Sequence, residues 1–346
     1  MDNSNQQGRF SKVASATAKS LRRLNIVERI RNLKAYALFI SMMLGIVLSP
    51  LLVDVRWFTC LFVSDPGHPV DVTVLTTYLL FCMLFITYCK VSPKQMRLER
   101  MHLWLLLTQW IGCWVVLALL FGLNPSVACG AYICIFISTA TSAPVITGML
   151  GGSVPRLATY CIMTNLSIAV VAPLYFSLMG LGGSDSGFLD NLITICRKVM
   201  PLALGPFFLS IIVKTFLPKV HNFFVSKQII SFWLWCVSLV LLMARTTGNL
   251  LKEDSSEYVT ALLVALSALG ACLAQFYVGR RIGRAHGDAV VGGQSLGQKN
   301  TILAIWMAQS FFDPKFALVS VAPATYVLWQ NLVNSWQMWR FNKAKK

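Results

Sequence analysis

Residues 292–300 read GGQSLGQKN, a glycine-rich and polar run inside a segment, about 290–311, that is otherwise apolar enough to cross a lipid bilayer. Hydrocarbon offers no water to an unpaired backbone group. Irregular backbone at membrane depth therefore persists only where protein encloses it or where it lines a cavity. The run predicts a broken membrane helix and marks the position of a site.

The composition of the whole chain is typical of a multi-pass membrane protein. Of its 346 residues, 56% are hydrophobic and 12% are charged, whereas about 25% are charged in soluble domains. A spanning helix needs roughly 20 mostly apolar residues. Segments that meet this requirement lie at about 36–54, 72–89, 102–121, 126–148, 157–179, 198–217, 228–245, 258–278, 290–311 and 316–338. These ten segments leave almost no chain for a soluble domain.

The net charge of +17 follows the connections between these segments. Lysines and arginines gather before the first segment, after the second, and then at alternate ends. By the positive-inside rule, these ends are cytoplasmic. We therefore expect a multi-pass protein of the cell membrane (inner or plasma), with both termini in the cytoplasm, contact with the lipid bilayer, and no nucleic-acid partner.

The longest polar interruption divides the expected spans five and five. An odd number of crossings in each half gives the halves opposite orientations, which is the arrangement of an inverted repeat. The expected parts are a basic cytoplasmic leader that includes a surface amphipathic helix (1–35), a first five-helix repeat (36–180), an extracytoplasmic linker (181–197), a second five-helix repeat (198–338) and a basic cytoplasmic tail (339–346).

A second interruption occupies the corresponding position of the first half. Residues 138–144 read STATSAP, and each interrupted segment is followed by one with an Ala-Pro step, Ala172-Pro173 or Ala322-Pro323. Interrupted helices at corresponding positions of two halves are the best sequence indication of a transporter's binding site. The chain is therefore expected to be an all-α integral membrane protein whose fourth and ninth helices are discontinuous.

Lys299 is the most informative single residue, because a lysine near the bilayer centre costs about 2.5–3.5 kcal/mol on insertion scales. The alternative is a side chain that extends to the membrane interface. No Asp or Glu occupies the middle of an expected span, so an anionic substrate fits this charge balance. Further candidates, which could instead hydrogen-bond helices together, are Gln109, Thr141, Ser142, Pro144, Thr164, Asn165, Ser295, Gln298 and Asn300.

Ser295 and Lys299 are four residues apart, so a regular helix would place them on one face as a serine–lysine hydrolytic dyad. Because the backbone is expected to be broken there, we do not expect an enzyme. The four histidines and ten cysteines are scattered and show no C-x-x-C spacing. No metal site and no cofactor are therefore expected.

These residues resemble the bile acid:sodium symporter family. The family's ninth span carries a Glu-x-Gly-x-Gln-Asn pattern, and residues 295–300 read SLGQKN in that register. Gln109, followed by an aromatic residue, is similar to the family's third-span glutamine. The resemblance implies ten transmembrane helices in two inverted five-helix repeats, with helices 4 and 9 crossing where they unwind. It also implies a panel group (spans one, two, six and seven) that moves against a core group.

The chain departs from this family at the sodium sites that the resemblance implies. The family's motif glutamate joins both sites and the following glutamine joins one, but Ser295 and Lys299 stand at these positions; Ala143-Pro144 replaces a Ser-Asn pair in span four. A hard cation needs several oxygen ligands. We interpret the Lys299 ammonium as standing where a sodium ion would. Burial disfavours the charged form of an amine, so this group could release and regain a proton during the transport cycle. We therefore expect transport to be sodium-independent or proton-linked.

The sequence thus favours a secondary active transporter of an organic anion, amphipathic like a bile or sterol acid. One alternative is an efflux permease of the related arsenite or auxin carrier type. A cysteine in span four would suit an oxyanion of arsenic, but neither Cys129 nor Cys134 lies beside the break at Pro144. A second alternative is a membrane sensor that binds a ligand but does not transport it.

Overall fold

The computed structural model describes residues 37, 39–53, 72–90, 97–181, 187–227, 229–252, 254, 257–312 and 314–344. The leader expected at 1–35 and residues 182–186 of the expected linker lie outside this part of the chain. Within it, the regular structure is helical, and its only β-type pairing is an isolated bridge between Thr139 and Lys299.

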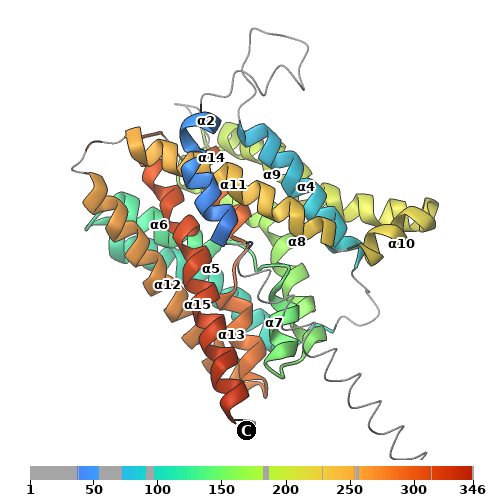
Figure 1. The fold of residues 1–346 in the computed structure, drawn as a ribbon. Coiled ribbons are helices and arrows are strands. Elements are labelled where there is room, and N and C mark those ends of the chain that lie inside the picture. Colours follow the sequence, from blue (N-terminus) through green and yellow to red (C-terminus); the bar gives the residue numbers. More distant parts are fainter. Residues whose placement is uncertain are drawn as a thin grey trace, which may run out of the picture.

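The helices form one bundle (Figure 1). Their order is α2 (Ser49–Val53), α4 (Val72–Cys89), α5 (Arg100–Phe121), α6 (Pro125–Phe136), α7 (Ala143–Met149), α8 (Val154–Leu178), α9 (Phe188–Phe216), α10 (Pro218–Ser226), α11 (Ile229–Lys252), α12 (Glu257–Ala285), α13 (Ala289–Gly297), α14 (Thr301–Phe311), the 3₁₀ helix η2 (Pro314–Ser320) and α15 (Val321–Ala344).

Six helical stretches in the described residues are long and apolar enough to cross a membrane. They are α5, α8, α9, α11, α12 and the stretch Phe316–Ala344 that contains α15. Shorter apolar helices lie at Leu75–Cys89, Pro125–Phe136 and Thr301–Phe311. The protein therefore has an all-α, membrane-embedded fold.

The helices pack in two groups. In one group, α4 contacts α9 and α11, and α11 also contacts α2; in the other, α12 contacts α5, α6, α13 and α15. Figure 1 shows α12, α13 and α15 side by side, with α4, α9 and α11 crossing the bundle at a different slope. Helices α6 and α13 belong to the second group, whereas α14 contacts both groups and α8 contacts α9 as well as α13.

Several helix boundaries differ from those expected, and two of the differences fall in the expected linker and tail. Helix α9 begins at Phe188, inside the expected linker and ten residues before the expected start at 198. Asp190 in its first turn is favourable at the positive end of a helix dipole, and apolar residues continue on both sides of it. Helix α15 continues through Arg340 to Ala344, so most of the expected tail at 339–346 is helical.

Both expected helix interruptions are present. Helix α6 ends at Phe136 and α7 begins at Ala143. The second interruption is narrower than predicted, since α13 runs to Gly297 and α14 begins at Thr301. The prediction of broken backbone throughout 292–300 is therefore wrong for 292–297, which is helical, and right for 298–300.

The glycines of α13 serve close helix packing. A Cβ built on Gly292 would collide with the carbonyl oxygen of Gly279 in α12. Likewise, a Cβ built on Gly279 would collide with the carbonyl oxygen of Gly292. Small residues let membrane helices approach until their backbones touch. This contact holds the first half of the interrupted helix directly against α12.

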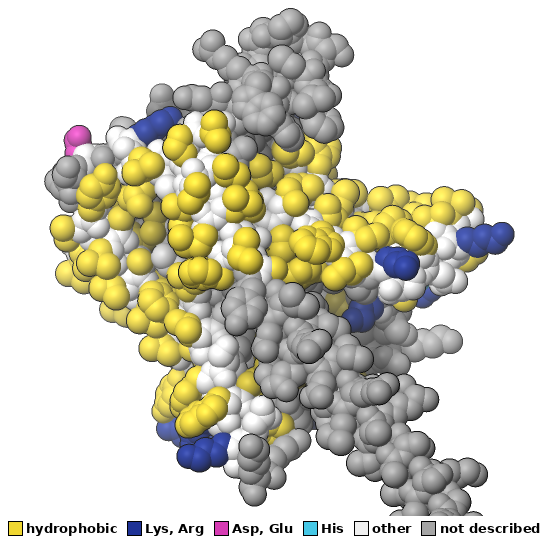
Figure 2. Space-filling model, in the orientation of Figure 1, with side chains coloured by type: hydrophobic (Ala, Val, Ile, Leu, Met, Phe, Trp, Pro, Cys, Tyr) yellow, Lys and Arg dark blue, Asp and Glu magenta, His cyan; other side chains and the backbone are white. Residues whose placement is uncertain are grey.

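Apolar side chains cover the outside of the bundle as well as its core. Leu119, Phe216 and Val259 are more than half exposed, and Figure 2 shows hydrophobic side chains across the visible face. Helices α6 and α14, in contrast, are buried over most of their length. Helices α6 and α14 therefore lie inside a bundle whose surface suits lipid.

We predict that Gly292→Ala destabilises the fold by about 1–3 kcal/mol, the usual cost of overpacking, because the added methyl group meets backbone atoms. The thermal unfolding midpoint of detergent-solubilised protein, followed by fluorescence size-exclusion chromatography, should fall. Gly270→Ala is the matched control, since Gly270 lies on α12 and a Cβ added there would meet nothing within 4 Å. Equal midpoints for the two variants would contradict this packing.

Candidate functional site

The two helix interruptions meet and are joined backbone to backbone. Thr139 and Lys299 form an antiparallel bridge. On either side of it, Ala140 N–H donates to Gln298 O at 2.9 Å, and Asn300 N–H donates to Ser138 O at 2.9 Å. Each non-helical segment thus supplies the hydrogen-bond partners that the other lost when its helix ended.

Lys299 is buried, with 1% of its surface exposed, and its ammonium lies against the C-terminal end of α6. Nζ donates to Ile135 O at 2.9 Å and to Ile137 O at 3.0 Å. The end of an α-helix carries unpaired carbonyls and the negative end of its dipole, so a cation is favourable there. The lysine therefore caps a half-helix and does not extend to the membrane interface.

Two glutamines complete the cap of α6. Gln109 Nε2 donates to Phe136 O at 2.7 Å and to Ile137 O at 3.0 Å. Gln275 Nε2 of α12 donates to Cys134 O at 3.3 Å. With Lys299, these side chains satisfy the carbonyls of residues 134–137. The predicted residue Gln109 thus reaches the interruption as a structural donor.

A tyrosine is bonded to each of these glutamines. Tyr160 OH of α8 donates to Gln109 Oε1 at 3.1 Å, and Gln275 Nε2 donates to Tyr326 OH of α15 at 3.0 Å. The members of each pair are 51 residues apart in the chain. Gln275 and Tyr326 were not among the predicted residues, and this repeated spacing is the sequence signal that identifies them.

Thr139 and Lys299 make equivalent bonds in opposite directions. Lys299 donates to Ile135 O, four residues before Thr139. Thr139 Oγ1 donates at 2.6 Å to Ser295 O, four residues before Lys299. Each interrupted helix therefore holds the C-terminal end of the other, with an ammonium on one side and a hydroxyl on the other.

Helices α8 and α15, the next long helices after the two interrupted ones, supply further partners. Thr139 N–H donates to Thr164 Oγ1 at 3.2 Å, and Lys299 N–H donates to Gln330 Oε1 at 2.8 Å. Asn165 Nδ2 donates to Thr139 O at 3.3 Å. The predicted residues Thr164 and Asn165 are thus brought to the crossing, but they bind its backbone. Gln330 is a further member that was not predicted from the sequence.

Three predicted residues offer polar groups at the crossing. Gln298 Nε2 donates to the hydroxyl of Ser142, which is exposed, at 3.2 Å. Gln298 Oε1 and Ser295 Oγ are buried and have no hydrogen-bond partner within the described residues. Ser295 therefore makes no dyad hydrogen bond with Lys299 in this structure. These groups are the ones left for a ligand.

The other three predicted residues shape the chain. Asn300 Oδ1 accepts from Leu303 N–H at 3.3 Å and so caps α14. Pro144 lies in the first turn of α7, where a missing N–H costs nothing. Thr141 is half-buried in the non-helical segment before it. These residues lie at the crossing without a bond that points to a ligand.

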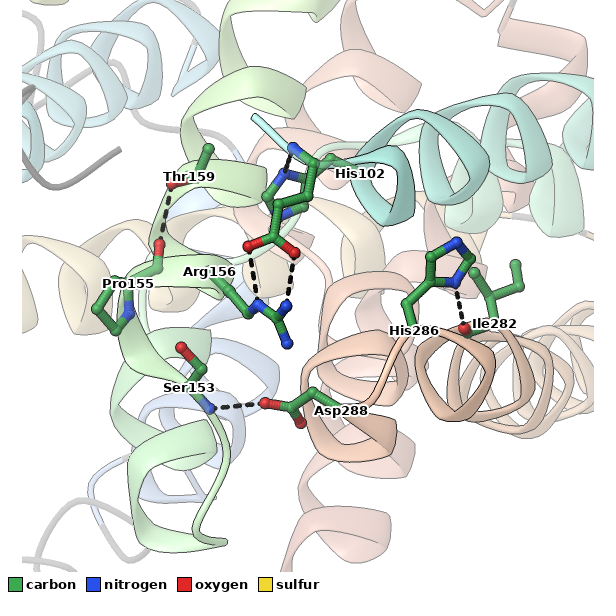
Figure 3. Close-up of polar contacts among 9 residues, drawn as sticks. His102, Ser153, Pro155, Arg156, Thr159, Ile282, His286 and Asp288 are labelled. Atoms are coloured by element: carbon green, nitrogen blue, oxygen red, sulfur yellow. Dashed lines mark hydrogen bonds and ion pairs between the residues drawn. The ribbon is translucent and has the colours of Figure 1, made fainter. Parts of the chain in front are cut away.

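At the other end of α13, polar groups connect it to α8 (Figure 3). Asp288 Oδ1 accepts from Val291 N–H at 2.9 Å and caps α13, while its Oδ2 accepts from Ser153 N–H at 2.9 Å. Arg156 makes a two-point ion pair with Glu99, with Nε–Oε1 at 2.9 Å and Nη2–Oε2 at 2.8 Å. In the sequence alone, these residues are indistinguishable from ordinary loop charges.

We predict that Thr139→Val lowers stability by about 1–3 kcal/mol, because the buried carbonyl of Ser295 loses its donor. The midpoint of thermal unfolding in detergent should fall accordingly. Thr108→Val is the control: its hydroxyl is exposed and bonds only Trp104 O of its own helix, at 2.7 Å. A midpoint for Thr139→Val that matches the control would show that the bond across the crossing adds no stability.

Comparison with known proteins does not assign the chain. No protein-family model matches it, and no curated protein matches it. The candidate site therefore rests on its own geometry, a crossing of two interrupted helices that encloses a buried ammonium.

Proposed function

We propose that this protein is a secondary active transporter that moves an organic anion by alternating access, and that the Lys299 ammonium takes the part of a coupling cation. The single observation that carries the proposal is the contact of Lys299 Nζ with Ile135 O and Ile137 O, at 2.9 and 3.0 Å, across the crossing.

The paired hydrogen bonds support two inverted five-helix repeats. A two-fold axis through the Thr139–Lys299 bridge would exchange the two backbone bonds beside it. The two glutamine–tyrosine pairs, each separated by 51 residues, repeat in the two halves of the chain, although both glutamines donate to α6. Random pairing of helices would not be expected to repeat the same contacts, so we propose ten spans arranged as two such repeats.

The two packing groups support movement between alternate states. Secondary transporters bind substrate where interrupted helices meet, and one bundle rocks against the other around that site. Here α4 packs with α9 and α11, and the two helices that end at the crossing, α6 and α13, pack with α12. The exposed hydroxyl of Ser142 and the unpartnered Gln298 Oε1 are the polar groups that we assign to the substrate.

The charge balance supports an anionic substrate. Lys299 is the only charged residue in the interruptions, 137–142 and 298–300. The acidic side chains of the described residues lie at helix starts or in connections; they are Glu99, Asp190, Asp254, Glu257 and Asp288. An amphipathic carboxylic or sulfonic acid of the bile-acid class is the first substrate to test.

The donor set does not fit the sodium sites implied by the resemblance. A sodium ion needs several oxygen ligands at short range. Lys299 Nζ occupies two carbonyl oxygens at the crossing and adds a like charge, and Ser295 brings no carboxylate. We therefore propose transport that does not depend on sodium, with proton linkage as the form of coupling to test.

We predict that uptake of radiolabelled taurocholate into proteoliposomes is equal in sodium and in N-methylglucamine media. An imposed proton gradient that accelerates uptake would mark proton linkage, and equal rates at all gradients would mark facilitated movement. Uptake that requires sodium would contradict the assigned role of Lys299. Saturable binding without uptake, by this or related acids, would favour the sensor alternative.

We predict that Lys299→Gln lowers uptake by about tenfold or more, within the usual range of coupling free energies, because the side chain keeps a donor but loses its charge. Lys219→Gln is the matched control, since Lys219 is exposed on α10. Size-exclusion profiles should show that both variants fold. Sodium-independent uptake by Lys299→Gln at the wild-type rate would contradict the proposal.

A further inference from the structure

We propose that adjoining ends of α12 and α15 bind the headgroup phosphate of an anionic phospholipid, through Arg280, Arg284 and Arg340, which we call the arginine cluster. The inference rests on the membrane-embedded fold and does not depend on the proposed transport function. It names a binding site that lies outside the helix crossing.

The arginine cluster is held in place by packing as well as by charge. Arg280 Nη2 donates to Gln337 Oε1 of α15 at 3.0 Å. Its aliphatic part covers Gly293, whose added Cβ would come within 2.6 Å of Arg280 Cγ. Arg284 lies one turn after Arg280 on α12, and Arg340 lies one turn after Gln337 on α15. Two helices thus bring three guanidinium groups together.

The acidic side chains described at this end of the bundle are engaged elsewhere. Glu99 pairs with Arg156, and both oxygens of Asp288 accept backbone N–H groups. Arg280 is instead bonded to the neutral carboxamide of Gln337. Positive charges gathered from two helices are best stabilised by an anion that comes from outside the protein.

Exposed aromatic side chains indicate the depth of the arginine cluster in the membrane. Trp336 and Trp339 of α15 are 52% and 60% exposed. The guanidinium of Arg340 lies 5.1 Å from the ring of Trp336, and Lys343 Nζ lies 5.4 Å from the ring of Trp339. Tryptophan is enriched at the level of lipid headgroups. Figure 2 shows basic side chains beside hydrophobic ones at this end.

Phosphate is the anion that suits this arrangement. Guanidinium groups bind phosphate oxygens through paired hydrogen bonds, and basic pockets between membrane helices bind anionic headgroups. The apolar outer surfaces of α12 and α15 next to this end, with Leu273 and Leu332 exposed, would lie along the acyl chains. This continuity favours a lipid over free phosphate.

The test compares lipid retention by full-length protein in native mass spectrometry, with phosphatidylglycerol and phosphatidylcholine as probes. We expect wild type to retain phosphatidylglycerol selectively. Arg284→Ala/Arg340→Ala should weaken retention by about tenfold or more, the effect of losing charge-assisted hydrogen bonds. Lys219→Ala/Lys227→Ala removes the same charge from α10 and its C-terminal end and should have no such effect.

The double variant Arg284→Lys/Arg340→Lys keeps both positive charges but removes the planar, two-point hydrogen bonding of the guanidinium groups. Retention of phosphatidylglycerol should therefore fall in this variant too. Unfolding midpoints measured without added lipid should match wild type, because Arg280 and its bond to Gln337 remain. If the α10 variant lost as much phosphatidylglycerol retention as the arginine variant, general surface charge would explain the effect and the proposal would be overturned. Displacement of the lipid by equimolar inorganic phosphate would overturn the lipid as the ligand.

Discussion

A helix that breaks inside a membrane leaves backbone groups that neither lipid nor water can satisfy, and the crossing of this chain is built around that requirement. The carbonyls of residues 134–137 take donors from Gln109, Gln275 and Lys299. The end of α13 in turn depends on the hydroxyl of Thr139. Neither interruption has a complete set of partners alone, so the site forms only when residues from both halves of the chain have come together.

The sequence predicts the broken helices better than it predicts the groups that bind them. Long apolar segments and two polar runs indicate both interruptions, because few other patterns place polar residues at that depth. The prediction was wrong at Gly292, because the sequence does not distinguish a glycine that permits close helix packing from a glycine that ends a helix. Gln275 bonds a carbonyl 141 residues away, and no local pattern shows that partner. The equal spacing of the glutamine–tyrosine pairs relates Gln275 to Gln109, but it does not identify that carbonyl.

The two sides of the crossing match in geometry and differ in charge. Thr139 places a neutral hydroxyl on the end of one half-helix, and Lys299 places an ammonium on the end of the other. The negative end of a helix dipole amounts to roughly half an elementary charge, so it offsets only part of a full positive charge. In the proposed mechanism, this remaining charge is what an organic anion would balance on entering the site.

The two carboxylate oxygens of Asp288 accept hydrogen bonds at the starts of two different helices. One oxygen caps α13 through Val291, and the other reaches across to Ser153 at the start of α8. Separating α8 from α13 would therefore break one bond and leave the other intact. The start of the helix that carries Ser295 and leads to Lys299 is therefore capped by its own residue, whether or not the bond to Ser153 is made.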